Sequence, residues 1–345
     1  MDTEPPLFDI VIIGGGPTGL FAAFCAGLRS MHTAIIDSLD VLGGQPSALY
    51  PDKFIYDVGG HPAILARTLI SELVRQTLPY APTIILGETI GGLQRGDDGL
   101  IVLTGSRGRY RARSAVIAAG GGAIEPHRRL PSEAGRLEGK GLEYILMDMS
   151  YYRGRRTLIV GGGEAAVEAA LAVGRAAQAV TLAHRGDALR ADPATLDRLR
   201  EAGVEVRPGR QLVALHGHTW VESAVLLNLG TGCEETLAVD AVLICAGFTL
   251  TLAPMHEWGL CVEPDGIPVT SRMETNLPGV FAAGDVVTYP GKLKLIATGF
   301  AEAAVAVHHA KMFIDPAGQA DLDRSTWLVP RLREAARRNA SHREP

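Results

Sequence analysis

The stretch "FDIVIIGGGPTGLFAAFCAGLRSMHTAIID" (residues 8–37) decides the fold, because it reads as a strand, a glycine-rich turn, a helix and a second strand that ends in an acid. Gly14, Gly16 and Gly19 match the spacing G-x-G-x-x-G. In such a unit the first glycine permits the tight turn, the second lets the backbone approach a pyrophosphate, and the third lets the helix pack on the strand. The helix N-terminus then faces the phosphates, and Asp37 is placed to bind a ribose. The alternative is an ordinary packing turn.

The same unit occurs a second time in the chain. The stretch "RTLIVGGGEAAVEAALAVGRAAQAVTLAHR" (residues 156–185) carries Gly161, Gly163 and Ala166 at the related spacing G-x-G-x-x-A. Its flanking runs again predict a strand before the turn and a helix after it. Two copies imply two bound dinucleotides, or one dinucleotide held across both copies.

The two units differ at the residue that follows the second strand. Asp37 and His184 each stand 23 residues after the first glycine of their loop. A carboxylate at this place would oppose a 2′-phosphate by about 4 kcal/mol at about 4 Å and an effective dielectric of about 20. His184 and Arg185 reverse that sign, and Arg190 is near enough along the chain to assist. The second unit is therefore predicted to prefer NADP(H), unless these side chains are only solvated charges at a strand end.

Composition excludes several classes of function. The chain has 345 residues, of which 47% are hydrophobic, enough for about two domains. Its net charge of −5 gives no reason to bind nucleic acid or an anionic membrane. No run of 18 apolar residues occurs, and the acidic start "MDTEPPLFDI" differs from a signal sequence, so we expect a cytoplasmic protein. The four cysteines are scattered, and we expect no metal site.

The order of strands predicts how the two units are joined. "SAVIAAGGG" (114–122) and "DAVLICAG" (240–247) are strands that run into Ala-Gly, as expected where the chain crosses between domains. The first domain would then be discontinuous, with residues 1–117 and 247–345, and the second would span residues 118–246. The expected fold is α/β, with two Rossmann-like dinucleotide-binding domains of the three-layer ββα type, the second inserted into the first.

Several longer segments together resemble a known family. They are "IIGGGPTGL" (12–20), "GGQPSALYPDKFIYDV" (43–58), "LIVGGGEAAVEAAL" (158–171), "METNLPGVFAAGD" (273–285) and "YPGKLKLIATGFAEA" (289–303). The chain resembles the thioredoxin-reductase-like ferredoxin–NADP(+) reductases from about residue 8 to residue 327. The segment at 43–58 is the most specific to this group, whereas the glycine loops belong to every flavoprotein that binds two dinucleotides.

The resemblance implies FAD in the first domain, NADPH in the second and a homodimer. Tyr50 matches the tyrosine that stacks on the isoalloxazine ring, and Arg324 stands where many members place a histidine against its other face. The residues implied to bind FAD are Gly14, Gly16, Pro17, Thr18, Gly19, Asp37, Gly44, Gln45, Tyr50, Ile90, Ile124, Asp285, Ser325 and Thr326. Those implied to bind NADPH are Gly161, Gly163, Glu164, Ala165, Ala166, His184, Arg185 and Arg190.

The chain departs from the family at three positions. Gly186 replaces the second arginine of a His-Arg-Arg sequence, and Glu164 stands where an aspartate is common. Arg324 replaces the histidine, and its guanidinium can also stack on an aromatic ring. Its fixed charge would favour an anionic reduced flavin.

The absence of a cysteine pair before the second glycine loop limits the route by which electrons can leave the protein. Electron transfer through a protein disulfide needs two cysteines close together, normally just before the second glycine loop, and "EYILMDMSYYRGRR" (143–156) contains none. Electrons must therefore leave from the flavin itself, after hydride transfer from NADPH, as single electrons to ferredoxin or flavodoxin. A rotation of one domain, with hinges near Gly120 to Gly122 and at Gly247, would bring nicotinamide and flavin together.

Other functions remain open from the sequence. One is an NADPH diaphorase that reduces quinones or other small oxidants, or another flavin-dependent reductase that acts on a thioredoxin-like partner through an external disulfide. Another is a flavin-bound redox sensor that is not an enzyme.

Overall fold

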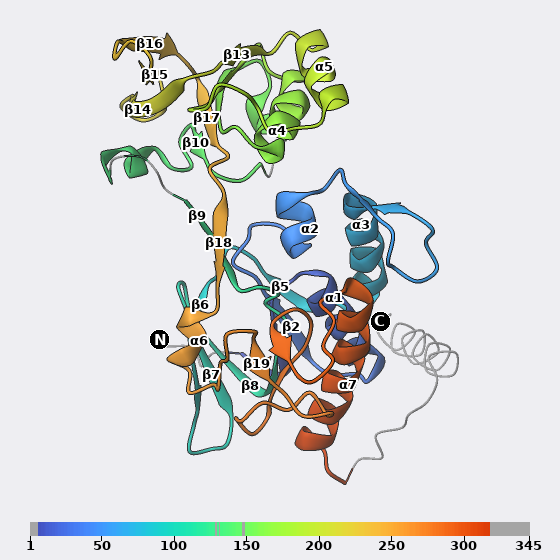
Figure 1. Ribbon diagram of the computed structural model, residues 1–345. Coiled ribbons are helices and arrows are strands. Elements are labelled where there is room, and N and C mark those ends of the chain that lie inside the picture. Colours follow the sequence, from blue (N-terminus) through green and yellow to red (C-terminus); the bar gives the residue numbers. More distant parts are fainter. Residues whose placement is uncertain (1–5, 128–129, 131, 147–148, 318–345) are drawn as a thin grey trace, which may run out of the picture. The chain divides into compact units, whose positions relative to one another are not determined.

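The computed structural model describes residues 6–127, 130, 132–146 and 149–317, and the chain forms two compact units (Figure 1). The first unit comprises Met1–Ala123 and Leu250–Pro345, and the second comprises Ile124–Thr249. The chain therefore leaves the first unit once and returns to it. None of the described helices is long and apolar enough to cross a membrane.

A mixed sheet forms the centre of the first unit, with the strand order β5-β2-β1-β8-β7-β6 and with β20 also paired to β8. β1 runs parallel to β2 and β8, and β20 runs parallel to β8. β7 is antiparallel to β8 and β6. The strands are β1 (Leu7–Ile13), β2 (Thr33–Ile36), β5 (Thr83–Ile85), β6 (Ile90–Arg95), β7 (Ile101–Gly105), β8 (Arg109–Ile117) and β20 (Val280–Ala282).

Alternation along β1 gives this sheet two buried faces. Ile10 and Ile12 join a core with α1 (Pro17–Leu28), α3 (Ala66–Thr77) and α7 (Ile296–Ile314), which lie side by side in Figure 1. Phe8, Val11 and Ile13 join the core of the opposite face, together with β6, β7 and Trp258. The result is a layer of helices, a central parallel sheet and a layer formed by the antiparallel strands and Trp258.

Shorter elements complete the first unit. They are α2 (Gly44–Leu49), β3 (Phe54–Ile55), β4 (Ile64–Leu65), η1 (Leu78–Tyr80), α6 (Ala253–His256), β19 (Ile267–Pro268) and β21 (Val287–Thr288). β3 pairs with β4 in an antiparallel hairpin, and β19 pairs with β21 in parallel.

The second unit repeats the plan with a parallel sheet of order β10-β17-β11-β12-β13 and an antiparallel sheet of order β14-β15-β16. Leu158 of β11 faces a core shared with the antiparallel sheet, and the next residue, Ile159, faces the core beneath α4. The strands are β10 (Leu142–Glu143), β11 (Arg156–Val160), β12 (Ala179–Ala183), β13 (Glu205–Arg207), β14 (Arg210–His216), β15 (Ser223–Asn228), β16 (Glu234–Ala238) and β17 (Ala241–Ile244). The helices are η2 (Ser132–Leu137), η3 (Met149–Tyr152), α4 (Glu164–Gly174) and α5 (Pro193–Glu201).

Two strands carry the chain from one unit to the other. β9 (Ala123–Pro126) and β18 (Phe248–Thr251) pair with each other. The sequence prediction divides the domains where the preceding strands end, at 117/118 and 246/247, whereas the compact units divide at 123/124 and 249/250. The loop before β9 stays with the first unit because Gly122 packs directly against the carbonyl group of Thr251 and Gly120 lies beside Gln45. The predicted α/β class, with parallel sheets and one unit inserted into the other, is confirmed.

Candidate functional site

The first glycine loop connects β1 to α1 and leaves room for a ligand at one position only. A Cβ on Gly14, whose φ is +108°, would overlap the carbonyl group of Ala118, and a Cβ on Gly19 would overlap the carbonyl oxygen of Gly14. A Cβ on Gly16 would instead have Gly44 Cα as its nearest neighbour, at 3.8 Å. Gly16 precedes the helix without a side-chain cap, so no described side chain caps the amides of the first turn. This arrangement fits a pyrophosphate.

Asp37 lies at the end of β2 and is built into the loop. Its Oδ2 accepts a hydrogen bond from the amide of Gly15 at 2.5 Å, and its Oδ1 accepts one from the amide of Leu39 at 2.8 Å. Burial raises the pKa of this carboxyl, while the two amide bonds act in the opposite direction. A carboxylate has about four acceptor positions, so two remain for the hydroxyls of a ribose. The ribose contact itself stays a prediction.

The segment after β2 brings α2 against the loop. The amide of Gly43 donates to the carbonyl oxygen of Gly15 at 2.8 Å, and a Cβ on Gly44 would stand 3.0 Å from Gly16 Cα. Gln45 follows, and its Nε2 lies 3.3 Å from the place of a Cβ on Gly120. The structure therefore brings Gly44 to the glycine loop and Gln45 to the turn at Gly120.

Tyr50 ends α2 and is half-buried beside the core of α1, α3 and α7. Burial raises the pKa of its hydroxyl, and the negative charges of Asp285 and Asp57 raise it further. Tyr50 is thus neutral at physiological pH and lies near Asp285. Stacking on a flavin ring remains a prediction.

Asp285 follows a turn between β20 and β21. The amide of Gly284 donates to Glu302 Oε2 at 2.7 Å, and Glu302 also binds Tyr289 and Lys292. The sequence reasoning missed this group. The sequence feature that could have revealed this group is a single acid, Glu302, inside the Ala-rich run "GFAEAAVAV". A charge on the buried face of a helix needs a partner.

The remaining predicted residues of the first site have mixed outcomes. Pro17 is the first residue of α1, and the hydroxyl group of Thr18 packs against Gly284. Ile90 is buried in the core beside β7, where its contact with a ligand is a prediction. Ile124 lies on β9, and its side chain is outside what the structure describes. Arg324, Ser325 and Thr326 lie outside the described residues.

The second glycine loop, between β11 and α4, repeats the sterics of the first. A Cβ on Gly161 would stand 2.6 Å from the carbonyl oxygen of Cys245 and 2.9 Å from the Cβ of Ala166, which is buried. A Cβ on Gly163 would meet no atom within 4 Å. Glu164 and Ala165 are exposed in the first turn of α4. This loop also has one open position that fits a pyrophosphate.

His184 is buried at the second glycine loop, which its position after the strand does not by itself predict. Its side chain is buried under the loop, with its Cβ 3.3 Å from the place of a Cβ on Gly162. Burial lowers the pKa of His184 more than the nearby Asp187 raises it. The ring is therefore mainly neutral at pH 7, whereas Arg185 and Arg190 are exposed. Their contact with a 2′-phosphate stays a prediction.

Arg190 is tied to the loop through its backbone. Its amide donates to the carbonyl oxygen of Gly162 at 2.8 Å. Gly186 packs beside His184, because a Cβ there would lie in ordinary contact with His184 Nδ1, at 3.7 Å. Compared with the His-Arg-Arg sequence that the resemblance implies, Gly186 leaves one fewer positive charge at this strand end.

The described residues contain neither a disulfide nor a cluster of metal-ligating side chains. All four cysteines are unpaired, and burial raises the pKa of Cys25 to about 11 and of Cys245 to about 12, so these two thiols are poor nucleophiles. No group of three or more metal-ligating side chains occurs in the described part of the chain.

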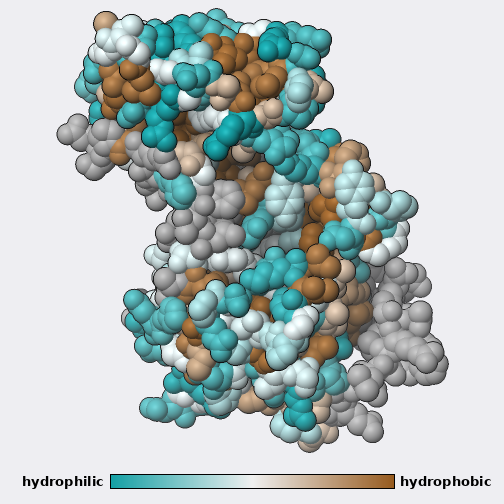
Figure 2. All heavy atoms as spheres, viewed as in Figure 1, coloured by the Kyte–Doolittle hydropathy of each residue, from teal (hydrophilic) through white to brown (hydrophobic). Residues whose placement is uncertain are grey.

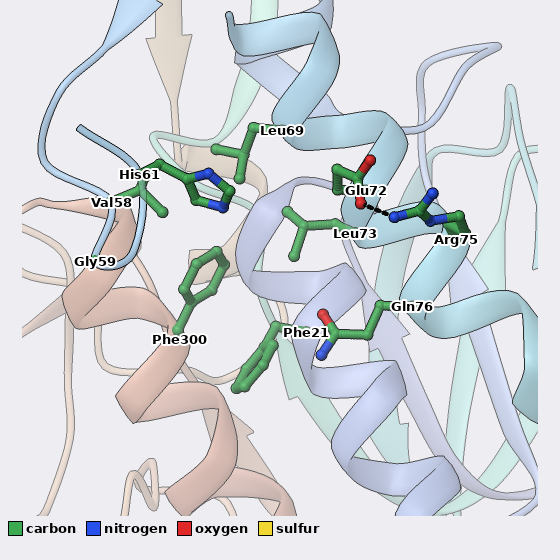
Figure 3. Close-up of a pocket in the computed structure, with 10 residues that line it drawn as sticks. All are labelled: Phe21, Val58, Gly59, His61, Leu69, Glu72, Leu73, Arg75, Gln76 and Phe300. Carbon is green, nitrogen blue, oxygen red and sulfur yellow. Dashed lines mark hydrogen bonds and ion pairs between the residues drawn. The ribbon is translucent and has the colours of Figure 1, made fainter. Parts of the chain in front are cut away.

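A further pocket of about 440 Å³ lies on the first unit and is lined by α1, α3, α7 and the β3–β4 connection. In Figure 3, the rings of Phe21 and Phe300 form one wall, and Leu69, Leu73 and His61 project from the opposite side. Glu72 and Arg75 form an ion pair at its edge. None of the predicted dinucleotide-binding residues lines this pocket.

The two loops define a class of protein that binds two dinucleotides, and the similarity of this chain to known proteins agrees with that class. Residues 8–310 match the model of the pyridine nucleotide-disulphide oxidoreductase family, and the chain belongs to this family. A relative named ferredoxin–NADP reductase 2, from Shouchella clausii, is 44% identical over 329 residues, which cover 95% of this chain and 100% of the relative. A ferredoxin–NADP reductase from Geobacillus kaustophilus is 43% identical and covers 93% of this chain and 97% of its own length.

Solved structures of similar fold include a thioredoxin reductase from Lactococcus lactis. It is 26% identical, with a TM-score of 0.61, and the match covers 90% of this chain and 99% of that one. This similarity confirms the two-unit architecture predicted from the sequence.

Substitutions at Gly16 and Gly19 should separate ligand space from packing. Gly16→Ala adds a methyl group at ordinary contact distance from Gly44, so we expect the thermal unfolding of the apoprotein to be unchanged and the dissociation constant for FAD to rise about tenfold or more. Gly19→Ala creates an overlap with backbone, so we expect it to destabilise the apoprotein by about 1–3 kcal/mol. Differential scanning calorimetry and flavin-fluorescence titration measure the two effects. Equal unfolding temperatures for the two variants would contradict the assignment.

Proposed function

We propose that this protein is a ferredoxin–NADP(+) reductase that uses FAD and NADP(H). The observation that carries the proposal is the pair of dinucleotide loops, one in each unit, combined with the absence of cysteine from residues 143–156. The names of the relatives that match almost the whole chain support the same reading. Bound FAD would accept a hydride from NADPH and deliver single electrons to a protein carrier.

The first unit supplies the groups that would hold FAD. The amides at the start of α1 would bind the pyrophosphate, and Asp37 would accept hydrogen bonds from the adenosine ribose. Gln45 would contact the flavin and Tyr50 would stack on it, while Asp285 would hold its sugar chain. The neutral hydroxyl of Tyr50, whose pKa is raised by burial, keeps a second negative charge away from Asp285.

The second unit supplies the groups that would select NADPH. The open position at Gly163 and the N-terminus of α4 would take the pyrophosphate. Arg185 would give its planar fork to the 2′-phosphate, with Arg190 beside it. His184, buried and mainly neutral, would support the loop from below.

Transfer through protein thiols is the less favoured route. Cys25 belongs to the first unit and is buried, and Cys245 follows β17 in the second unit, so neither provides the paired, activated thiol that disulfide reduction needs. A one-electron carrier such as ferredoxin or flavodoxin is therefore the proposed acceptor. Four unpaired cysteines also suit a reducing compartment, which supports the proposed cytoplasmic location.

The resemblance to the reductase family supports a homodimer as the proposed assembly. The first unit exposes large apolar side chains that a partner could cover, among them Phe54 and Tyr56, whose rings lie 6.4 Å apart beside the β3–β4 hairpin. Leu293 is also exposed, by 62% of its surface. Such exposed apolar groups are typical of a protein–protein contact.

A coupled assay tests the proposed activity. With NADPH, the purified protein should reduce cytochrome c at a rate that depends on added ferredoxin or flavodoxin, because the carrier takes electrons from the flavin one at a time. The same protein should not reduce a thioredoxin disulfide. Cytochrome c reduction that is unaffected by the carrier would favour a diaphorase, and a flavin that NADPH cannot bleach would favour a redox sensor.

Arg185→Ala tests the selection of NADPH. Loss of a charge-assisted contact to the 2′-phosphate should raise the KM for NADPH about tenfold or more and leave the KM for NADH nearly unchanged. Steady-state kinetics with each coenzyme measure the ratio. Arg198→Ala removes an exposed arginine on α5 and serves as the matched control. An unchanged NADPH/NADH ratio in Arg185→Ala would refute the phosphate role.

A further inference from the structure

Glu302 is a fully engaged acid inside the helical layer of the first unit. It lies on α7, only 4% exposed, within a run of alanines. Its Oε1 accepts hydrogen bonds from Tyr289 Oη and from Lys292 Nζ, each at 2.6 Å. Lys292 is equally buried, with 6% of its side chain exposed, so the two form a buried ion pair. We call Glu302, Lys292 and Tyr289 the buried triad.

The other carboxylate oxygen of Glu302 binds a backbone amide. Its Oε2 accepts a hydrogen bond from the amide of Gly284 at 2.7 Å. Gly284 has a φ of +87° and directly precedes Asp285. The triad therefore fixes the backbone turn that carries Asp285. Among the described hydrogen bonds, none joins the triad to the Asp285 side chain itself.

Thr18 connects this turn to the phosphate loop. The Oγ1 of Thr18, in the first turn of α1, lies 2.7 Å from the place of a Cβ on Gly284, and it also blocks the place of a Cβ on Gly299. The turn, α7 and the start of α1 thus meet at backbone distance around one hydroxyl group. A shift of the Gly284 amide would move Asp285 relative to the α1 N-terminus.

Stability alone does not account for such a pair. Desolvation of two charges offsets much of their attraction, and apolar replacements of buried ion pairs are often as stable as the original. The hydroxyl of Tyr289 is held neutral as a donor, because burial and the charge of Glu302 raise its pKa to about 12. The geometry instead shows three donors converging on one carboxylate, one of them the backbone of the Asp285 turn.

We propose that Glu302 and Lys292 are positioning residues for FAD: the buried triad anchors the Gly284 amide and so holds Asp285 in place for the sugar chain of the flavin. The inference rests on the proposed FAD site of the first unit and not on the identity of the electron acceptor. Tyr289 completes the anchor by restraining the same carboxylate oxygen as Lys292.

Two matched double variants separate positioning from stability. Lys292→Met/Glu302→Met replaces the ion pair with apolar side chains and removes the acceptor for Gly284. Lys292→Met/Glu302→Gln is also neutral but keeps an amide oxygen that can accept that hydrogen bond. Val307→Ala, at a fully buried position of α7 outside the buried triad, controls for general destabilisation of the helix.

The readout is the affinity of each apoprotein for FAD and, separately, for ADP, which lacks the flavin and its sugar chain. For Lys292→Met/Glu302→Met we expect a dissociation constant for FAD about tenfold above wild type, with that for ADP unchanged. For Lys292→Met/Glu302→Gln we expect a dissociation constant for FAD within about threefold of wild type. Val307→Ala should lower the unfolding temperature and leave both affinities unchanged.

A double-mutant cycle with Asp285→Asn closes the test. If the triad acts through Asp285, adding Lys292→Met/Glu302→Met to Asp285→Asn should cause little further loss of FAD affinity, because the effects are not independent. The inference would be overturned if the triad variant and Asp285→Asn reduced FAD affinity independently, so that their effects multiplied. It would also be overturned by equal FAD affinities for the two double variants, or by a loss of ADP affinity parallel to that of FAD.

Tyr289→Phe gives a milder version of the same test if the methionine variant does not fold. It removes one hydrogen bond to Glu302 and leaves the ion pair, so we expect a loss of FAD affinity of about threefold that disappears in the Asp285→Asn background. A loss that persists there would refute the positioning role. A wild-type apoprotein that binds no FAD would instead refute the proposed function, so the two failures are distinguishable.

Discussion

Both units depend on the same steric constraint, which is the close approach of a helix to the strand that precedes it. In the first unit, Gly19 has no room for a side chain against the carbonyl oxygen of Gly14, and in the second, Ala166 occupies the corresponding place beside Gly161. The turn between strand and helix is then so tight that backbone amides face outward. Only one position of each loop remains open, and that position can admit a pyrophosphate.

The constraint extends to the residue that ends the second strand of each unit. The middle glycine of the first loop, Gly15, lies against Asp37, and the middle glycine of the second, Gly162, lies against His184. A shared sequence offset therefore marks a shared place in space. This regularity is why the fold and the two loops could be predicted from the sequence, whereas the neutral state of His184 depends on burial that spacing does not reveal.

The contacts that sequence patterns could not predict are those between distant parts of the chain. Glu302 reaches the amide of Gly284 because α7 packs beside α1, and a lone acid among alanines indicates only that some partner exists. The compact units divide at 123/124 and 249/250 for the same reason, since Gly122 packs against Thr251, far along the chain. Such packing is decided by the tertiary fold, while local patterns predict strands, turns and helices.

The central claim is that reducing power passes from NADPH to a flavin and leaves without a sulfur relay. The most direct measurement is anaerobic stopped-flow reduction of the flavin by NADPH, followed by mixing with oxidised ferredoxin, in a variant with all four cysteines replaced by alanine. The account predicts that flavin bleaching and reoxidation proceed at rates close to those of the natural chain. Loss of reoxidation by ferredoxin in the cysteine-free variant, with flavin reduction intact, would contradict it.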